Sequence, residues 1–325
     1  MPKYKVVFTD YYYPDNLKEV KILQQLDSVE ILDCTRLKSG GVKQADEVIQ
    51  YVRDADAIIV QFAEISKKVI DQLEKCRIIS RYAIGVDNID VEAAKKKGIV
   101  VSNVPDYCLE EVSDSTIAHL LNCLRKISIA NYYFHNRTWD YGKIKPLHRL
   151  ANLKVGLVAF GHIARRVAEK LRPYRLKMFA YDPYFKDTQL YDWVDFVSLK
   201  HLLAESDIVS IHAPYTKETH HLIDEEKLGW MKDGVIIINT SRGGVIDEKA
   251  LEKAILTGKV AMAGLDVLDS PDIDYYRSPL ANYPEKVIIT PHMAWYSEEA
   301  ISELQTKTAL NVYEVLKNGR PLYRV

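Results

Sequence analysis

The amino-acid sequence predicts an α/β protein in which helices cover both faces of parallel sheets. Two stretches of the chain, residues 1–101 and the part from Lys154 onward, alternate short β-rich runs with helical patterns. This alternation is typical of parallel sheets, because the strands are joined by crossover helices. Residues 154–182 also contain a strand, a glycine turn, a helix and a second strand in that order. At 325 residues the chain is long enough for two domains of ordinary size.

The first stretch predicts a sheet of five strands with helices between them. Runs rich in apolar and β-branched residues predict strands at 6–9, 29–32, 57–61, 78–82 and 99–102. Helical periodicity predicts helices near 16–26, 44–53, 66–74 and 90–97. The segment RYAIGVDNID (81–90) follows the fourth strand, at the end where open α/β sheets bind ligands.

A long helical pattern and an irregular segment connect the two stretches. Ile117, Leu120 and Leu124 lie on one apolar stripe, which predicts a single helix over residues 109–133. Residues 134–152 are aromatic and basic with little periodicity, which predicts an extended arm. Such an arm could contact a partner subunit or form a surface loop, and the sequence leaves both readings open.

The stretch from Lys154 begins with a pattern that predicts a dinucleotide-binding unit. A short strand ends at Gly161, a helix follows, and a second strand ends at Asp182. In such units the N–H groups at the helix N-terminus bind the pyrophosphate, and the acid accepts hydrogen bonds from a ribose hydroxyl. The three glycine positions of the turn hold Ala159, Gly161 and Ala164. We expect strain at Ala159, because a tight turn there favours a residue without a Cβ.

Polar residues follow the later strands of the second stretch, where an open α/β sheet binds its ligand. Arg242 offers a planar fork suited to a carboxylate, and His292 offers an imidazole, which titrates near neutral pH. Together with a nucleotide-binding unit they predict hydride transfer to a 2-oxo acid, although each alone could be a structural residue. The further strands are predicted at 196–199, 208–214, 235–241, 261–267 and 287–292, with helices near 200–205, 224–231, 247–257 and 298–317.

Composition and charge argue against several other functions. The chain is 47% hydrophobic and 27% charged with a net charge of −1, so nucleic acid is not an expected partner. No apolar run approaches the roughly 20 residues that a membrane helix needs. A strand begins within four residues of Met1, which leaves no room for a signal peptide. The four cysteines lack metal-ligand spacing, so we expect reduced thiols, no metal and a cytoplasmic protein.

Six segments carry a resemblance to a known family. They are RYAIGVDNID (81–90), EEVSDSTIAHLL (110–121), DIVSIHAPYTKETHHLI (207–223), INTSRGGVIDEKAL (238–251), AGLDV (263–267) and ITPHMAWYS (289–297). In order and spacing they resemble the D-isomer-specific 2-hydroxyacid dehydrogenase family over nearly the whole chain. The stretch TPHMAWYSEEA (290–300) is most similar to the phosphoglycerate dehydrogenase-like and C-terminal-binding-protein-like branches.

The resemblance implies two doubly wound parallel-sheet domains. Residues 103–295 would form a Rossmann-type NAD-binding domain, and residues 1–102 with 296–325 a flavodoxin-like substrate domain. The implied activity is that of an NAD-dependent D-2-hydroxyacid dehydrogenase, which transfers hydride reversibly between NADH and a small 2-oxo acid. Phosphoglycerate, hydroxypyruvate and glyoxylate represent the implied substrate class. The long helix and its arm match the family's dimer interface, which implies a homodimer.

The resemblance also assigns roles to individual residues. Arg242 matches the arginine that binds the substrate carboxylate and polarises its carbonyl, and His292 matches the acid/base histidine. Asp266 matches the acid that faces the nicotinamide carboxamide, and Asp182 the ribose-binding acid that favours NAD over NADP. The implied cofactor-binding residues are Phe160, Gly161, His162, Ile163, Asp182, Ala213, Pro214, Thr240, Ser241, Arg242, Asp266 and His292. The implied substrate-binding residues are Ile84, Gly85, Val86, Arg242 and Trp295.

One catalytic residue of the family has no clear match. The family places a glutamate after its Asp-Val pair to orient the histidine, but the segment DVLDSPDID (266–274) contains none. Pro271 occupies the usual position, and Asp269 or Asp272 could serve instead. This departure and the altered glycine turn would suit an alternative, an NAD(H)-sensing corepressor-like scaffold with weak dehydrogenase activity. The presence of Arg242 and His292 argues against that alternative.

Overall fold

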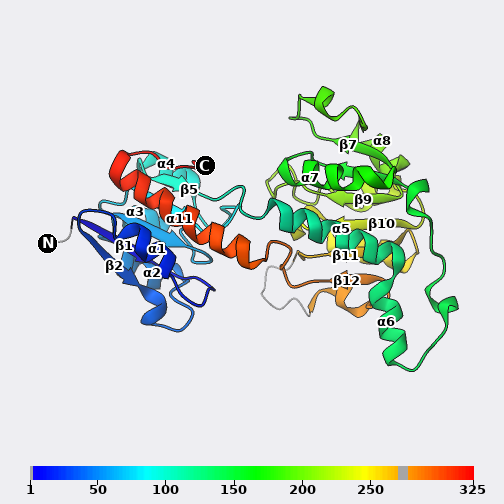
Figure 1. Ribbon diagram of the computed structural model, residues 1–325, viewed down its shortest axis with the longest axis horizontal. Helices are drawn as coiled ribbons and strands as arrows, with labels where there is room; N and C mark the ends of the chain where they lie inside the picture. The colour runs from blue at the N-terminus through cyan, green and yellow to red at the C-terminus, as the bar shows by residue number, and fades with distance from the viewer. Residues whose placement is uncertain (1–2, 270–276) are drawn as a thin grey trace. The chain divides into compact units, whose positions relative to one another are not determined.

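The computed structural model describes residues 3–269 and 277–325, and the chain divides into two compact units. The first unit comprises Met1–Tyr107 and Ser297–Val325, and the second comprises Cys108–Tyr296. Each unit is a parallel sheet flanked by helices, so the predicted fold class is confirmed (Figure 1). None of the described helices is both long and apolar enough to cross a membrane.

Within the described residues, the first unit contains a five-stranded parallel sheet in the order β2-β1-β3-β4-β5. This strand order is the flavodoxin-like one that the sequence resemblance implied. The strands are β1 (Tyr4–Phe8), β2 (Val29–Asp33), β3 (Ala57–Val60), β4 (Ile78–Arg81) and β5 (Val100–Ser102). The helices are α1 (Leu17–Leu23), α2 (Ala45–Val52), α3 (Lys67–Asp71), α4 (Val91–Lys96) and the C-terminal α11 (Glu298–Asn318).

Helix α11 returns to the first unit and packs beside α1 (Figure 1). The Ser80 hydroxyl on β4 donates to the Thr308 carbonyl at 3.1 Å, and the Tyr4 hydroxyl donates to the Leu316 carbonyl at 3.1 Å. The Ser297 hydroxyl caps the helix N-terminus by accepting from the N–H of Ala300. The first unit is therefore assembled from both ends of the chain.

The second unit holds a sheet ordered β12-β11-β10-β9-β6-β7-β8, with its described strands all parallel. The chain reverses its direction of winding between β6 and β9, and α/β sheets bind ligands at such a switch point. The strands are β6 (Lys154–Val158), β7 (Lys177–Tyr181), β8 (Val194–Phe196), β9 (Ile208–Ile211), β10 (Val235–Asn239), β11 (Val260–Leu265) and β12 (Val287–Ile289). The helices are α5 (Leu109–Arg125), α6 (Ile127–His135), α7 (His162–Leu171), α8 (Leu199–Glu205), α9 (Glu225–Trp230) and α10 (Glu248–Leu256).

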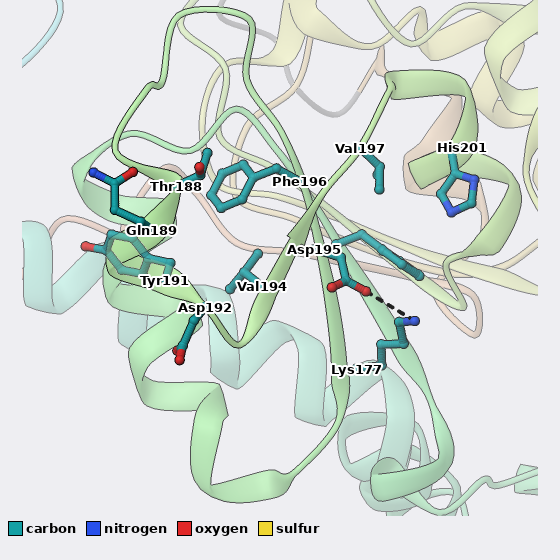
Figure 2. A pocket seen from close by; sticks show the side chains of 11 residues that line it. Lys177, Thr188, Gln189, Tyr191, Asp192, Val194, Asp195, Phe196, Val197 and His201 are labelled. Carbon is teal, nitrogen blue, oxygen red and sulfur yellow. Dashed lines mark ion pairs between the residues drawn. The ribbon is translucent and has the colours of Figure 1, made fainter.

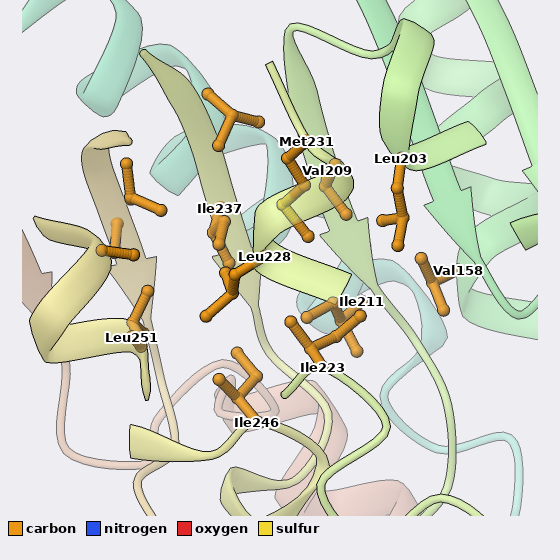
Figure 3. Close-up of a cluster of buried hydrophobic side chains, with 14 of the residues drawn as sticks. Val158, Leu203, Val209, Ile211, Ile223, Leu228, Met231, Ile237, Ile246 and Leu251 are labelled. Carbon is orange, nitrogen blue, oxygen red and sulfur yellow. The ribbon is translucent and has the colours of Figure 1, made fainter. Parts of the chain in front are cut away.

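The apolar run of β10 shows why the second sheet is buried on both faces. Val235 and Ile237 belong to a core cluster that Leu228 of α9 and Leu251 of α10 complete (Figure 3). Ile236 and Ile238, by contrast, belong to the cluster under α5 and α7 on the opposite face. Successive side chains of a strand point to opposite faces, so a strand covered on both faces must be apolar throughout.

The predicted single helix over residues 109–133 is wrong in one respect. The chain breaks at Lys126, whose φ of 51° lies in the left-handed region, and this separates α5 from α6. A left-handed residue ends the ladder of helical hydrogen bonds. The expected extended arm contains two 3-10 turns, Tyr141–Ile144 and Leu150–Asn152.

The strand predicted at residues 196–199 begins and ends earlier than expected. Strand β8 ends at Phe196, and Ser198 already caps α8, because its hydroxyl accepts from the N–H of His201 at 3.3 Å. The apolar pattern could not separate the edge strand from the first turn of the helix, since both contribute buried residues.

Candidate functional site

Six neighbouring strands of the second unit end in register at one edge of the sheet. The pairs Tyr181–Val158, Val158–Ile211, Ile211–Asn239, Asn239–Leu265 and Leu265–Ile289 connect β7, β6, β9, β10, β11 and β12 in one line. Every cofactor-binding residue implied by the sequence follows this line by five residues or fewer. The parallel topology therefore brings residues as far apart in the chain as Phe160 and His292 to one edge.

The turn after β6 has the strain that the sequence predicted. Ala159 adopts a φ of 68°, in the left-handed region that favours glycine. Gly161 caps α7, and a Cβ built on it would meet no other atom within 4 Å. The space beside Gly161, at this helix N-terminus, is therefore open. These features fit the pyrophosphate of NAD, because an exposed helix N-terminus attracts anions.

Asp182 organises this turn from the end of β7. One carboxylate oxygen accepts from the N–H of Phe160 at 2.8 Å, and the other accepts from the N–H groups of Tyr184 and Phe185 at 2.8 and 3.2 Å. The carboxylate is half-buried, and its two oxygens offer about four lone-pair positions. It can therefore hold the turn and still accept from a ribose hydroxyl.

Phe160 has a structural role in the turn after β6. Its side chain is fully buried and packs edge-on against Phe185, Tyr191 and Phe196, with ring centroids about 5 Å apart. Its N–H is already donated to Asp182. Phe160 therefore anchors the turn in the core, and its implied cofactor contact stays a prediction.

The other implied residues near the turn differ in exposure. His162 is exposed, and its Nδ1 lies 3.0 Å from Nη2 of Arg165. Ile163 is partly buried against the core of the second unit. After β9, Ala213 is buried and Pro214 is exposed, so only the latter side chain faces solvent.

The turn that carries Arg242 is built by Asn239, which the sequence reading did not single out. The buried Asn239 side chain accepts from the N–H and the hydroxyl of Ser241 at 2.9 and 2.8 Å, and donates to the Arg242 carbonyl at 3.0 Å. A Cβ on Gly243 would lie 2.0 Å from the backbone of Leu268, so only glycine fits there. The motif N-T-S-R-G-G (239–244) is the sequence feature from which this turn could have been predicted.

Arg242 and Thr240 differ in their contacts. The Thr240 hydroxyl is buried and lies 2.7 Å from the Thr116 hydroxyl on α5. Arg242 is half-buried, and its Nη1 donates to the Ser241 carbonyl at 2.8 Å. Thr240 thus ties the edge of the sheet to α5, while Arg242 extends beyond the strand.

His292 lies on a loop that Asp266 and Trp295 hold in a left-handed conformation. Its φ is 51°, and its N–H donates to the carbonyls of Asp266 and Thr290 at 3.0 and 2.9 Å. The indole N–H of Trp295 donates to the His292 carbonyl at 2.9 Å. A non-glycine residue with this φ is uncommon and is often found at functional sites. The backbone of the predicted acid/base residue is therefore fixed from both sides.

The carboxylate of Asp266 holds the residues that follow His292. Oδ1 accepts from the N–H of Met293 at 3.0 Å and from the Thr290 hydroxyl at 2.5 Å, and Oδ2 accepts from the N–H of Ala294 at 2.8 Å. Asp266 is 1% exposed. These contacts give Asp266 a structural role in the His292 loop that the resemblance had not implied.

His119 of α5 also contacts this loop, and the sequence reading missed it. Its Nε2 lies 2.9 Å from the Thr290 hydroxyl. Burial lowers the pKa of His119, and the nearby carboxylate of Asp266 partly opposes this effect. The sequence offered only a single histidine in a long helical pattern, and such a residue is more often a buried structural ring.

The structure gives Asp269 a different partner from the one that was considered. Its Oδ2 lies 2.8 Å from Nε2 of His221, and its N–H donates to Glu248. The hydrogen bond to His221 uses Oδ2 of Asp269, and the assignment of Asp269 as the acid partner of His292 stays a prediction. Asp272, the other candidate, lies outside the described residues. His221 has a φ of 48°, and the sequence reading did not identify it as a partner.

In the first unit, the segment Ile84–Val86 follows β4 and presents backbone N–H groups. The carbonyl of Ile84 accepts from Asn103 at 2.6 Å, and that of Gly85 accepts from Arg81 at 2.8 Å. Within residues 3–269 and 277–325, no hydrogen bond uses the three N–H groups of this segment. The loop therefore fixes its carbonyls and leaves its donors available, as an anion-binding loop would.

A recess of about 520 Å³ beside β7 and β8 contains none of the predicted site residues. Figure 2 shows the ion pair of Lys177 and Asp195 at its rim, with an N–O distance of 3.2 Å. Both side chains are about half exposed, so this contact is a solvated surface pair.

In the described part of the chain, no group of three or more potential metal ligands is close enough to hold a metal ion.

Comparisons with known proteins agree with this arrangement. Residues 117–294 match the family described as D-isomer specific 2-hydroxyacid dehydrogenase, NAD binding domain. The chain is 34% identical over 302 residues to a hydroxypyruvate reductase of Thermotoga maritima, with coverage of 92% of this chain and 94% of that protein. It is 32% identical over 323 residues to a glyoxylate reductase of Thermococcus litoralis, with coverage of 97% and 95%.

A solved structure extends the similarity to the whole fold. The D-lactate dehydrogenase of Aquifex aeolicus, complexed with NAD and lactic acid, matches with a TM-score of 0.85 and 29% identity over 96% of this chain and 95% of that one. These relatives bear the names of reductases and dehydrogenases, which does not favour the scaffold alternative. The chain belongs to the D-isomer specific 2-hydroxyacid dehydrogenases, and it is an NAD-dependent oxidoreductase that acts on D-2-hydroxy acids.

Proposed function

We propose that Arg242 and His292 are the substrate-binding and acid/base residues of a reductase for a small 2-oxo acid. The observation that carries the proposal is the register of β10, β11 and β12, which supports a common site for residues at their carboxyl ends. The left-handed conformation of His292 gives further support, because backbone strain of this kind is concentrated at functional sites.

The proposed reaction adds a hydride and a proton across the carbonyl group of the 2-oxo acid. NADH, when bound, would supply the hydride for the 2-oxo carbon. Arg242 binds the carboxylate through its planar fork, which orients the carbonyl and polarises it. The imidazolium of His292 donates the proton to the carbonyl oxygen and becomes neutral, and the product is a 2-hydroxy acid. In the reverse direction neutral His292 accepts the hydroxyl proton.

The proposed substrate class is that of hydroxypyruvate, glyoxylate and phosphoglycerate. The names of the relatives from Thermotoga maritima and Thermococcus litoralis support this class. We place Ile84–Val86 as a carboxylate-binding segment, since its N–H groups are available. Trp295 is the proposed contact to the substrate side chain, because its indole ring is tied to the His292 carbonyl.

A panel of 2-oxo acids tests the proposed function directly. Purified protein is incubated with NADH and with glyoxylate, hydroxypyruvate, 3-phosphohydroxypyruvate, pyruvate or phenylpyruvate, and NADH oxidation is recorded. We expect turnover that is fastest with one of the first three acids. His292→Asn serves as the background control. Tight NADH binding without turnover of any acid would contradict the reductase function and support the scaffold alternative.

We also propose that the protein is a homodimer that uses α6 and the arm after it. Large apolar side chains are exposed here: Ile127 is 62%, Phe134 55%, Trp139 90% and Tyr141 76% exposed. An exposed apolar patch of this kind often marks a protein interface. Sedimentation of the wild-type protein and of Trp139→Ser tests the proposal, with a dimer expected for the first and dissociation at lower concentration for the second.

The proposed location is the cytoplasm, where thiols stay reduced. Burial raises the pKa of Cys34 to about 11 and those of Cys76 and Cys123 to about 12. Buried thiols with such pKa values are mainly protonated at neutral pH and react slowly with oxidants. All four cysteines are free, which supports a reducing compartment, and fractionation of the source cells would test the location.

A further inference from the structure

A chain of hydrogen bonds leads from helix α5 to the loop that carries His292. It runs from Nε2 of His119 to the Thr290 hydroxyl, then to Oδ1 of Asp266, and from this carboxylate to the N–H groups of Met293 and Ala294. We propose that His119 is a positioning residue that holds the His292 loop in its active conformation through Thr290 and Asp266. The inference rests on the proposed role of His292.

The direction of each hydrogen bond follows from the chemistry of the three side chains. Thr290 has one hydroxyl hydrogen, and an ionised carboxylate can only accept, so Thr290 must donate to Asp266. The hydroxyl oxygen of Thr290 then accepts from His119, which requires a hydrogen on Nε2 of the imidazole. His119 carries this hydrogen as the neutral Nε2–H tautomer or as the imidazolium. The imidazole thereby orients the Thr290 hydroxyl towards Asp266.

The geometry around His119 leaves little freedom for the imidazole. His119 is 6% exposed, and a Cβ on Gly264 of β11 would lie 3.0 Å from the His119 Cβ and 3.1 Å from its Nδ1. Only a glycine on the strand lets the ring lie this close to the sheet. One turn earlier on α5, Thr116 contacts Thr240 at the end of β10. The helix is thus held against the edge of the sheet at two points.

The His292 loop needs such support because its backbone is strained. The φ of 51° at His292 persists because the carbonyl and the carboxylate of Asp266 bind three successive N–H groups of the loop, those of His292, Met293 and Ala294. A carboxylate bound by well-oriented donors keeps its position, whereas one that has lost a donor can rotate. Weakening the bond from Thr290 therefore releases the loop.

Amide hydrogen exchange and steady-state kinetics test the proposal on the full chain. His119→Leu fills a similar volume with an apolar side chain and removes the Nε2–H donor. His119→Gln places an amide N–H near the position of Nε2. In His119→Leu we expect exchange at Met293 and Ala294 to be about tenfold faster and kcat about tenfold lower, as for the loss of one buried hydrogen bond. The Kd for NADH should stay the same. His119→Gln should restore both quantities.

Two further variants separate positioning from a general loss of stability. Cys123→Ala removes packing from the same buried face of α5 one turn later, so it should leave kcat and exchange at Met293 unchanged. Thr290→Val removes the middle hydroxyl and should match His119→Leu without adding to it in the double variant, because both break one chain.

The outcomes distinguish this inference from the proposed function. Unchanged exchange at Met293 and Ala294 in His119→Leu would overturn the positioning role, whether or not the wild-type protein turns over any 2-oxo acid. If exchange is faster in His119→Leu but kcat is unchanged, the positioning by His119 has no importance for catalysis. Absence of wild-type turnover would instead overturn the proposed function. The exchange result would still show whether the contact between His119 and Thr290 holds the His292 loop.

Discussion

The Asp266 carbonyl accepts the N–H of His292 at 3.0 Å, and the carboxylate of the same Asp266 holds the two residues that follow. One buried acid thus fixes a histidine with a φ of 51° at the end of the sheet. The acid follows β11 directly and the histidine follows β12 by three residues, and these two strands are neighbours in the sheet. Their relationship suggests how a conformation that is unfavourable by itself becomes a stable part of the site.

Asp266→Asn tests this relationship with an almost identical shape. An amide has one oxygen, so one of the two carboxylate positions becomes a donor that faces the N–H of Met293 or Ala294. We expect a loss of about 1–3 kcal/mol in the free energy of unfolding, the cost of an unsatisfied buried donor, together with a lower kcat. Urea denaturation at neutral pH measures the first quantity. The control is Asp195→Asn, a half-exposed acid that should cost about 1 kcal/mol or less.

Ala159→Gly should relieve strain in the nucleotide-binding turn. The left-handed φ of 68° at Ala159 costs energy because of its Cβ, and glycine removes this cost at the expense of a more flexible unfolded chain. We expect NADH to bind more tightly, by about 1 kcal/mol at most, in a fluorescence titration. Arg175→Gly is a matched control, because exposed Arg175 has a φ of 58° outside the turn. Equal tightening in both variants would refute a local effect.

Replacement of the two proposed catalytic residues should separate proton transfer from substrate binding. His292→Asn removes the proton donor, so kcat should fall by about 10²–10⁴-fold while NADH still binds. Arg242→Lys keeps the charge but loses the planar fork, so the KM for the 2-oxo acid should rise as kcat falls. Steady-state kinetics with the best acid of the panel measures both. A His292→Asn enzyme with normal kcat would exclude the proposed role.

The pH profile can identify the acid that acts with His292. A carboxylate beside an imidazole raises its pKa and keeps the proton available for reduction at higher pH. Because Asp269 pairs with His221, we expect Asp269→Asn to leave the descending limb of reductive activity where it is. If Asp272 is the partner, Asp272→Asn should shift this limb to lower pH. If Asp269→Asn alone shifts the descending limb, Asp269 and not Asp272 is the acid that acts with His292.

Stability should fall in mild acid because of a partly buried histidine directly after β9. Burial lowers the pKa of His212 to about 4, from the ordinary value of 6.5. Between these two values the unfolded chain binds a proton that the folded chain does not, so the free energy of unfolding decreases as the pH falls from about 6.5 to 4. His212→Gln should reduce this slope in urea titrations. His119, whose pKa is also lowered by burial, contributes in the same direction, so part of the slope should remain. An identical slope in the variant would disprove the contribution of His212.

Local patterns in the sequence were sufficient to predict the fold class and the edge of the sheet where the candidate site residues lie. Apolar runs of strand length alternate with helical periodicity, and this alternation alone predicts parallel sheets. The positions of Arg242 and His292 after apolar runs predicted that both lie at carboxyl ends, and the strand register agrees. The left-handed residue at Ala159 was also predictable, because the requirement for glycine is a property of the turn itself.

Only the tertiary structure decided which side chains meet. His119 and Thr290 are separated by 171 positions, and Asp269 and His221 by 48, so no local pattern relates them. The contact between Asp269 and His221 could not be predicted from the sequence, because it joins two separate loops. A strand or helix forms according to the spacing of apolar residues along the chain, which can be read locally. A hydrogen bond between distant side chains depends on where the packed elements place them, and that position is determined only when the sheet and α5 have assembled.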